Sequence, residues 1–171
     1  MSSKKILVTG GSGMVGRALQ EIMPNAIYPS SEALDLTDKE DTGRFLWMYG
    51  PTTVVHLAAT VSGIEDNIKR PYSHYLDNIL MNSLLIDSAK ESECKNFIGM
   101  LSTCAYQDKA PEYPLKEEMI FDGKPADSNF SYGFAKRAMA VQIEACNKQH
   151  DTNYQYMIPC NIYGRHDKYD E

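Results

Sequence analysis

Short apolar runs alternate along this chain with longer segments whose apolar residues recur at helical spacing. The short runs predict β-strands at residues 6–9, 25–28, 53–57, 96–101 and 154–159. The longer segments predict helices at residues 14–23, 38–49, 72–92 and 130–150, with Thr37 as the N-cap of the second helix. This alternation predicts an α/β fold in which a parallel sheet carries helices on both faces.

A polar stretch at residues 105–127, rich in proline and charge, interrupts the alternation and is predicted to be a loop. No repeat, low-complexity run or break in composition divides the 171 residues, so we expect one domain over 1–171. In a parallel sheet of this kind, ligands bind beyond the carboxyl ends of the strands. The candidate functional residues follow those ends.

The first predicted strand runs directly into a glycine-rich turn, Gly10-Gly11-Ser12-Gly13-Met14-Val15-Gly16. Gly10 permits a tight turn, Gly13 lets a pyrophosphate approach the backbone, and Gly16 lets the next helix pack against the strand. The N-terminus of that helix offers free N–H groups to the anion. A plain turn between two elements can also be rich in glycine. The position between an apolar strand and an amphipathic helix favours a Rossmann-type dinucleotide site at residues 10–16.

The residues after the second predicted strand bear on the choice between NAD and NADP. Ser30 and Ser31 stand where a domain that binds NAD usually has an acid for the ribose 2′-OH. Hydroxyl groups do not repel a 2′-phosphate, so we predict NADP(H) as the cofactor. Glu32 follows closely and no arginine stands nearby, which weakens this inference.

Two further segments are candidate walls of the cofactor site. Asp35 and Leu36 are expected to contact the adenine, although Asp35 is equally suited to a role as a turn or cap residue. Leu57, Ala58 and Ala59 end the third predicted strand, where small side chains leave room for a flat cofactor.

A tyrosine and a lysine one helical turn apart are the candidate catalytic pair. Tyr132 and Lys136 share one face of the last predicted helix. A nearby ammonium is expected to lower the pKa of the Tyr132 phenol, which would give a proton to a carbonyl oxygen during hydride transfer. Ser102, at the end of the fourth predicted strand, would hydrogen-bond the same oxygen. The order of serine, tyrosine and lysine is more specific than the pair alone.

Cys104 lies two residues beyond Ser102. A thiol beside positive charge has a lowered pKa and can take a proton from a carbon next to a ketone. A small buried residue with no chemical role is the alternative that the residues leave open.

The helix predicted at 72–92 has an apolar stripe wider than one sheet contact needs. A deep core would explain the stripe, but we expect a homodimer in which the helices at 72–92 and 130–150 face a second copy of the chain.

Composition excludes several classes of protein. The net charge of −6 argues against a nucleic-acid partner, and no apolar run is long enough to span a membrane. The chain starts without the apolar segment of a signal peptide. Its 4 cysteines are widely spaced, as expected for free thiols in a cytoplasmic protein, and predict no metal site.

The chain resembles the extended short-chain dehydrogenases/reductases. The likeness rests on the glycine turn, on Ser102, on Tyr132 with Lys136, and on residues 56–59 and 159–164. It covers essentially the whole chain. Within this family, residues 101–104, 129–136 and 163–167 are similar to enzymes that epimerise and then reduce a GDP-linked 4-keto-6-deoxy sugar.

This resemblance implies NADPH as cofactor, a GDP-sugar as substrate, and a homodimer. It implies that Cys104 is the acid/base at C3 and C5 of the sugar, next to the keto group at C4. Ser102 and Tyr132 would stabilise the C4 oxygen, and Lys136 would hold the nicotinamide ribose and tune Tyr132. Further cofactor contacts are implied for Leu101, Pro159, Asn161 and Ile162.

The sequence departs from the family pattern near its end. Arg165 stands where the family usually has proline, Lys168 where it has asparagine, and Cys160 where it has threonine. The histidine that serves as partner acid in relatives lies beyond the last residue, as does most of the substrate lobe. We therefore expect an incomplete domain with a missing C-terminal substrate lobe, and an exposed apolar surface where that lobe would pack.

Two alternatives remain at this point. The first is another nucleotide-sugar epimerase or dehydratase of the same superfamily. A dehydratase would be expected to carry an acidic pair where this chain has Cys104 and Ala105. The second is a protein that binds NADP without turnover.

Overall fold

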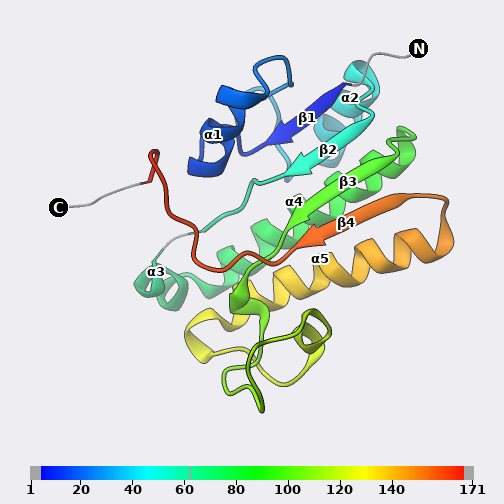
Figure 1. Cartoon of the computed structure of the whole chain (residues 1–171). Helices are drawn as coiled ribbons and strands as arrows, with labels where there is room; N and C mark the ends of the chain where they lie inside the picture. Colours follow the sequence, from blue (N-terminus) through cyan, green and yellow to red (C-terminus); the bar gives the residue numbers. More distant parts are fainter. Residues whose placement is uncertain (1–4, 62, 168–171) are drawn as a thin grey trace.

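Four parallel strands form one sheet in the order β1-β2-β3-β4 (Figure 1). They are β1 (Ile6–Thr9), β2 (Thr53–His56), β3 (Asn96–Met100) and β4 (Asn153–Met157). The computed structural model describes residues 5–61 and 63–167. The remaining residues, which include both ends of the predicted domain 1–171 and Lys168, lie outside the described part. The predicted parallel sheet is confirmed.

Helices cover both faces of the sheet, but unequally. They are α1 (Met14–Ile22), α2 (Lys39–Tyr49), α3 (Ile64–Lys69), α4 (Pro71–Glu91) and α5 (Phe130–Gln149). Figure 1 shows α1 on the near face and α2, α4 and α5 behind the sheet. The loop between β3 and α5 contains three short 3₁₀ helices, η1 (Thr103–Ala105), η2 (Glu117–Phe121) and η3 (Asp127–Asn129).

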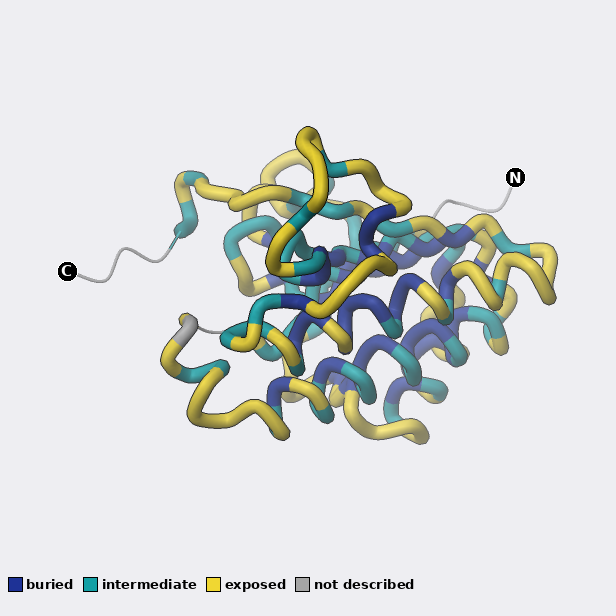
Figure 2. The backbone as a smooth tube through the Cα atoms, turned by 90° about the horizontal axis from the view of Figure 1, so that it is seen from below, coloured by how far each residue is buried: buried dark blue, intermediate teal, exposed yellow. Residues whose placement is uncertain are grey.

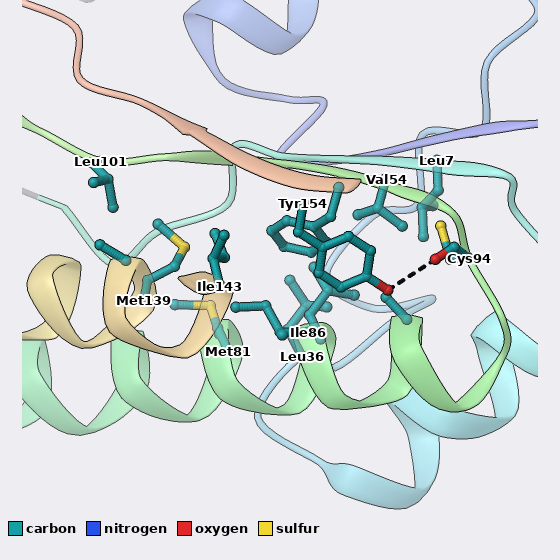
Figure 3. Close-up of a cluster of buried hydrophobic side chains, with 14 of the residues drawn as sticks. Leu7, Leu36, Val54, Met81, Ile86, Cys94, Leu101, Met139, Ile143 and Tyr154 are labelled. Atoms are coloured by element: carbon teal, nitrogen blue, oxygen red, sulfur yellow. Dashed lines mark hydrogen bonds between the residues drawn. The ribbon is translucent and has the colours of Figure 1, made fainter. Parts of the chain in front are cut away.

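The main core lies between the sheet and the two long helices (Figure 3). Parallel register aligns Leu7, Val54, Phe97 and Tyr154 in one row across the strands. Side chains alternate between the faces of a strand, so this buried row points toward α4 and α5. Figure 2 shows that burial on both long helices is confined to a stripe. The side of α5 away from the sheet is largely exposed, whereas on α4 only residues near the two ends are exposed.

The opposite face of the sheet is covered only near α1. Val8 on β1 is buried, whereas Gln155 on β4 is exposed and Met157 is 56% exposed. An apolar side chain at this open end of the sheet agrees with the expectation of an exposed apolar surface.

The prediction of a strand at 25–28 is wrong. This segment makes a single parallel bridge between Ile27 and Leu7, with hydrogen bonds from Val8 N to Ile27 O (2.8 Å) and from Ile27 N to Ile6 O (2.8 Å). Pro24 and Pro29 flank the segment, and neither has an N–H to extend the ladder.

Two other local features differ from the prediction, the N-cap of α2 and the presence of helix α3. Asp38 caps α2, because its carboxylate accepts from Asp41 N (2.8 Å), so the prediction of Thr37 as N-cap is wrong. Helix α3 was not predicted, since its 6 residues are too few to show an apolar period.

Candidate coenzyme and catalytic site

A cavity of about 400 Å³ opens at the carboxyl ends of β1 and β2. It brings together the following residues that the sequence singled out: Gly10, Gly11, Ser12, Gly13, Ser30, Ser31, Asp35, Leu36, Leu57, Ala58 and Ala59. The segments that contain them are far apart in sequence and meet only because the strands are parallel and in register. The cavity is therefore lined by the predicted glycine turn, by the residues after the segment at 25–28, and by the small side chains beyond β2.

Backbone packing around the glycine turn explains the need for glycine. Gly10 has a positive φ of 73°, and a Cβ there would lie 2.6 Å from Ala58 N. A Cβ on Gly16 would overlap with the carbonyl oxygen of Gly10. Gly13 is the N-cap of α1, and glycine has no side chain that could cap the helix. The first N–H groups of α1 are therefore left for an anion.

The far end of the cavity is polar without being basic. Ser30 and Ser31 line it, and the described lining includes no lysine or arginine. Asp35 lines it too, and its carboxylate accepts from Thr37 Oγ1 (2.6 Å) and Thr37 N (2.8 Å). These hydrogen bonds lower the pKa of Asp35. Asp35 therefore serves as a turn residue and a cavity wall together, and the two readings of the sequence are compatible.

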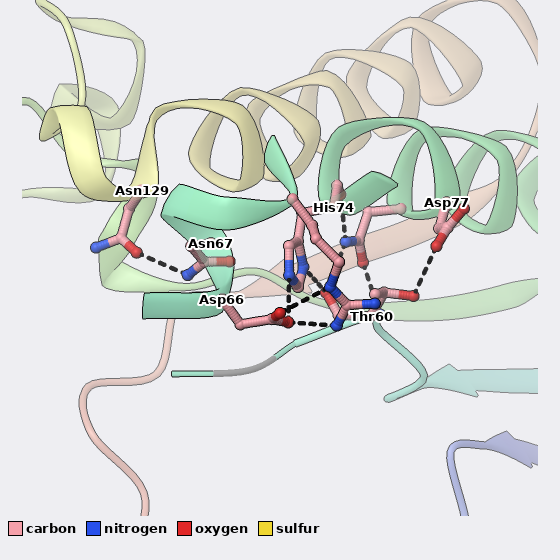
Figure 4. A network of polar contacts seen from close by, with 8 residues as sticks. Thr60, Asp66, Asn67, His74, Asp77 and Asn129 are labelled. Carbon is pink, nitrogen blue, oxygen red and sulfur yellow. Dashed lines mark hydrogen bonds and ion pairs between the residues drawn. The ribbon is translucent and has the colours of Figure 1, made fainter. Parts of the chain in front are cut away.

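A hydrogen-bonded corner that the sequence analysis missed holds the segment beyond β2 (Figure 4). Thr60 lines the cavity, and its backbone oxygen accepts from Asn78 Nδ2 (2.8 Å). The buried His74 ring lies between that oxygen, 3.2 Å from Nδ1, and Asp66 Oδ2, 3.0 Å from Nε2. Asn78 and His74 look like ordinary polar positions of an amphipathic helix, so no local signal marked them.

Ser102 and Cys104 follow β3 in one tight turn. Ser102 is the N-cap of η1, and its hydroxyl oxygen accepts from Cys104 N (3.2 Å). Gly133 then lets α5 approach closely, because a Cβ there would lie 2.6 Å from Cys104 O. The sequence analysis gave Gly133 no role, because the backbone that it approaches is distant in the sequence.

Tyr132 and Lys136 lie on the buried side of α5. Lys136 is only 2% exposed, and its ammonium donates to Met100 O (2.7 Å) at the end of β3. The Lys136 Nζ atom is 5.6 Å from the centre of the Tyr132 ring. Tyr132 interacts with both Ser102 and Cys104. The structure thus brings the four predicted catalytic residues to one place.

The expected lowering of the Tyr132 pKa is wrong for this structure. Burial, with a smaller contribution from Cys104, raises the pKa of Tyr132 to about 12, although a hydrogen bond with Ser102 acts against the rise. Burial lowers the pKa of Lys136 to about 8. The prediction considered the nearby ammonium and omitted the loss of water around the phenol, which has the larger effect here.

The described residues show neither a metal site nor a membrane span. No group of three or more histidine, cysteine, aspartate or glutamate side chains among them is arranged to hold a metal ion. Over residues 5–61 and 63–167, no helix combines the length and the apolar character needed to cross a membrane.

A family model described as "NAD dependent epimerase/dehydratase family" matches residues 6–171. The chain belongs to this family.

Several curated proteins that are similar to this chain have names that refer to GDP-sugars. The chain is 37% identical to the "Probable GDP-L-fucose synthase" of Drosophila melanogaster over 97% of its own length. It is 35% identical to the "GDP-L-colitose synthase" of Yersinia pseudotuberculosis over 98% of its length. The chain spans about half of each relative, 54% and 56% respectively.

Solved structures of similar proteins share this fold. A GDP-L-fucose synthetase from Naegleria fowleri bound to NADP superimposes with a TM-score of 0.86 at 34% identity. That comparison covers 98% of this chain and 53% of the other. The Rossmann-type fold is therefore confirmed, and the match is to about half of the longer protein.

Eight of the predicted cofactor residues are not part of the cavity lining: Met14, Val15, Gly16, Leu101, Lys136, Pro159, Asn161 and Ile162. Met14 and Val15 are in the first turn of α1, and Leu101 is buried in the main core. Pro159, Asn161 and Ile162 follow β4, where Asn161 and Ile162 are exposed. The chain then turns toward α1, and His166 Nε2 lies 3.0 Å from Glu21 Oε1. Cofactor contact at these eight positions, as at the predicted residues that line the cavity, stays a prediction.

Replacing Lys136 should remove a characteristic rise of stability with pH. The pKa of Lys136 is about 8 in the folded protein and 10.5 as its ordinary value, so between pH 8 and pH 10 only the unfolded state holds the proton. Stability therefore increases over this range, by about 2 kcal/mol from this group. Urea unfolding should show this increase for the wild type and for Lys148→Met, at an exposed lysine of the same helix, but not for Lys136→Met. Parallel curves for wild type and Lys136→Met would contradict the burial of an ionisable amine.

Proposed function

We propose that this chain provides the coenzyme-binding and catalytic part of an NADPH-dependent enzyme that converts GDP-4-keto-6-deoxy-D-mannose to GDP-L-fucose by epimerisation at C3 and C5 and reduction at C4. The observation that carries the proposal is the meeting of Ser102, Cys104, Tyr132 and Lys136 at the same edge of the sheet as the glycine-lined cavity. The names of the relatives support the substrate class.

The cavity fits a dinucleotide with a 2′-phosphate. Gly13 leaves the start of α1 open to a pyrophosphate, and Ser30 and Ser31 offer hydroxyl groups where an acid would repel a phosphate. The likeness to a solved structure with NADP bound supports the same choice. When bound, NADPH supplies the hydride for C4 of the sugar.

Tyr132 is suited to act as the proton donor to the C4 oxygen. Its raised pKa of about 12 means that the phenol holds its proton at neutral pH. Ser102, which interacts with the Tyr132 hydroxyl, would donate a hydrogen bond to the same substrate oxygen and stabilise negative charge on it. The Lys136 ammonium, anchored at Met100 O, would orient the nicotinamide ribose.

Cys104 is proposed as the acid/base for the two epimerisations. It is half-buried, and it lies in the turn that Ser102 caps and that Gly133 allows α5 to approach. A keto group at C4 acidifies the hydrogens at C3 and C5, and hydrogen bonds from Ser102 and Tyr132 to the C4 oxygen would stabilise the enolate that forms.

A related GDP-sugar reaction is the second candidate. The "GDP-L-colitose synthase" of Yersinia pseudotuberculosis matches this chain almost as well as the fucose synthases do. The residues that would choose between the sugars must touch the hexose, whereas the cavity beyond β1 and β2 is the one proposed here for the dinucleotide. An NADP-binding chain without turnover is the remaining alternative.

We also propose that the chain forms a homodimer through α4 and α5. An apolar groove of about 510 Å³ lies over these helices, with Tyr75, Phe121, Phe134 and Val141 in its lining. These four side chains are exposed on the side away from the sheet, and Val141 is 54% exposed.

The four cysteines are all free thiols, which favours a reducing compartment such as the cytoplasm.

Cofactor binding can be tested with two glycine variants. The wild-type chain should bind NADPH more tightly than NADH, as measured by nicotinamide fluorescence. Gly16→Ala should weaken NADPH binding at least tenfold, because the added methyl group pushes α1 away from Gly10 O. Gly43→Ala on α2 is the matched control, since its nearest neighbour would be 3.9 Å away, and it should bind like wild type. A folded wild-type chain that binds neither cofactor would exclude the proposal.

Catalysis by Cys104 can be tested separately from reduction. With the protein, NADPH and the GDP-linked keto sugar in D₂O, wild type should incorporate deuterium at C3 and C5. Cys104→Ser should reduce this exchange by a factor of about 100 or more, a usual size for loss of a positioned acid/base, and leave C4 reduction of the unepimerised sugar measurable. Equal exchange in both proteins would show that another group is the base. Reduction without exchange in the wild type would favour a simple 4-reductase.

The proposed dimer predicts a mass of twice 19.2 kDa in light scattering or sedimentation equilibrium. Val141→Glu should shift the protein to monomer, because a buried unpaired carboxylate is costly at an apolar interface. Trp47→Glu is the control, since Trp47 is 82% exposed but lies on α2. A monomeric wild type, or equal dissociation of both variants, would argue against this surface.

A further inference from the structure

A buried chain of hydrogen bonds joins the cofactor turn to the catalytic helix through His56. Thr9 Oγ1 lies 2.7 Å from His56 Nδ1, and His56 Nε2 lies 2.9 Å from Asn82 Oδ1. Asn82 Nδ2 donates to Ala135 O at 3.4 Å, and Ala58 N donates to Thr9 Oγ1 at 3.4 Å. Thr9, His56 and Asn82 are each 1% exposed, so bulk solvent does not compete for these bonds.

The acceptor at one end of this relay decides which nitrogen of His56 carries the proton. The Ala135 carbonyl can only accept, so the amide nitrogen of Asn82 must face it and the amide oxygen must face His56. The Nε2 atom therefore donates to Asn82 Oδ1. The Nδ1 atom is then left to accept from the Thr9 hydroxyl, whose oxygen accepts from Ala58 N.

Charge also requires a neutral ring at this position. Burial, and to a smaller extent the nearby Lys136 ammonium, lower the pKa of His56 to about 3, although the hydrogen bond with Asn82 acts against this shift. A protonated His56 would place two cations in the same buried region. The ring is thus a fixed connector with one donor and one acceptor, and it does not titrate near neutral pH.

The two ends of the relay adjoin the two halves of the candidate site. Thr9 is followed directly by Gly10, which packs against the backbone of Ala58. Ala135 is followed directly by Lys136 on α5. Asn82 belongs to α4, so four segments from distant parts of the sequence are joined through one imidazole.

We propose that His56 is a positioning residue, held as the neutral Nε2–H tautomer by Thr9 and Asn82, that fixes helix α5 and its Lys136 relative to the cofactor turn. The inference rests on the proposed function, because the geometry it protects is that between a bound dinucleotide and Lys136. Thr9 lines the cavity, whereas His56 and Asn82 do not, so His56 acts on the site through its hydrogen-bond partners.

Imidazole ¹⁵N chemical shifts of the wild-type full chain test the hydrogen-bond assignment directly. At pH 7, His56 should show a protonated Nε2 and an unprotonated Nδ1. The Asn82→Leu variant keeps the volume but removes the acceptor, so the ring should change toward the Nδ1–H tautomer. A wild-type ring that is an imidazolium, or that carries its proton on Nδ1, would overturn the assignment without any need for a variant.

NADPH affinity then separates positioning from general stability. Asn82→Leu should weaken NADPH binding about tenfold, the effect expected for one lost buried hydrogen bond. The control is Asn147→Leu at an exposed position of α5, which removes the bond from Asn147 Nδ2 to Tyr154 O (2.7 Å) and the two bonds that Asn147 Oδ1 accepts from Thr152 Oγ1 and Tyr154 N, none of which belongs to the relay. It should lower the melting temperature and leave the affinity unchanged.

Each outcome of this comparison has a distinct meaning. Wild-type affinity in a folded Asn82→Leu protein would overturn the positioning role. An equal loss of affinity in both variants would reduce the relay to a contribution to stability and would also overturn that role. A wild-type chain without NADPH affinity would contradict the proposed function and with it the positioning role, while the ¹⁵N shifts would still decide the tautomer.

Discussion

Parallel pairing of the four strands is the constraint on which the rest of this structure depends. Register aligns Thr9 with His56 and His56 with Gly99, so the carboxyl ends of β1, β2 and β3 meet at one edge. The glycine turn, the small residues beyond β2, and the turn with Ser102 and Cys104 all follow these ends. Side chains far apart in sequence thereby share one site. In a sheet of hairpin-connected antiparallel strands, successive strands would end at opposite edges instead.

Close backbone approach is the second theme of the site. Gly10 lets the first turn touch the backbone at Ala58, and Gly133 lets α5 touch the backbone at Cys104. Both contacts bring a functional segment nearer to its neighbour than any side chain would permit. Burial is also the main cause of the shifted pKa values at the site, because it raises the pKa of Tyr132 and lowers the pKa of Lys136.

Several buried polar groups of the described residues have hydrogen-bond partners on other segments, and these bonds join the segments. His56 connects Thr9 with Asn82, His74 connects Thr60 with Asp66, and Lys136 ends at a strand carbonyl. Such networks are costly when one member is left alone. In this protein they surround the cavity and the catalytic turn, where the relative placement of segments matters most.

The sequence by itself determined the alternation of strands and helices, the glycine turn, and the four catalytic candidates. These are local signals, since apolar period and residue spacing depend on neighbours along the chain. Only the tertiary structure decided that residues 25–28 make one bridge, that Asp38 caps α2, and that the Tyr132 pKa is raised. The roles of His56, Asn82 and Gly133 also emerged only there. Burial and hydrogen-bond direction depend on groups that are distant in sequence, so the spacing of residues along the chain cannot predict them.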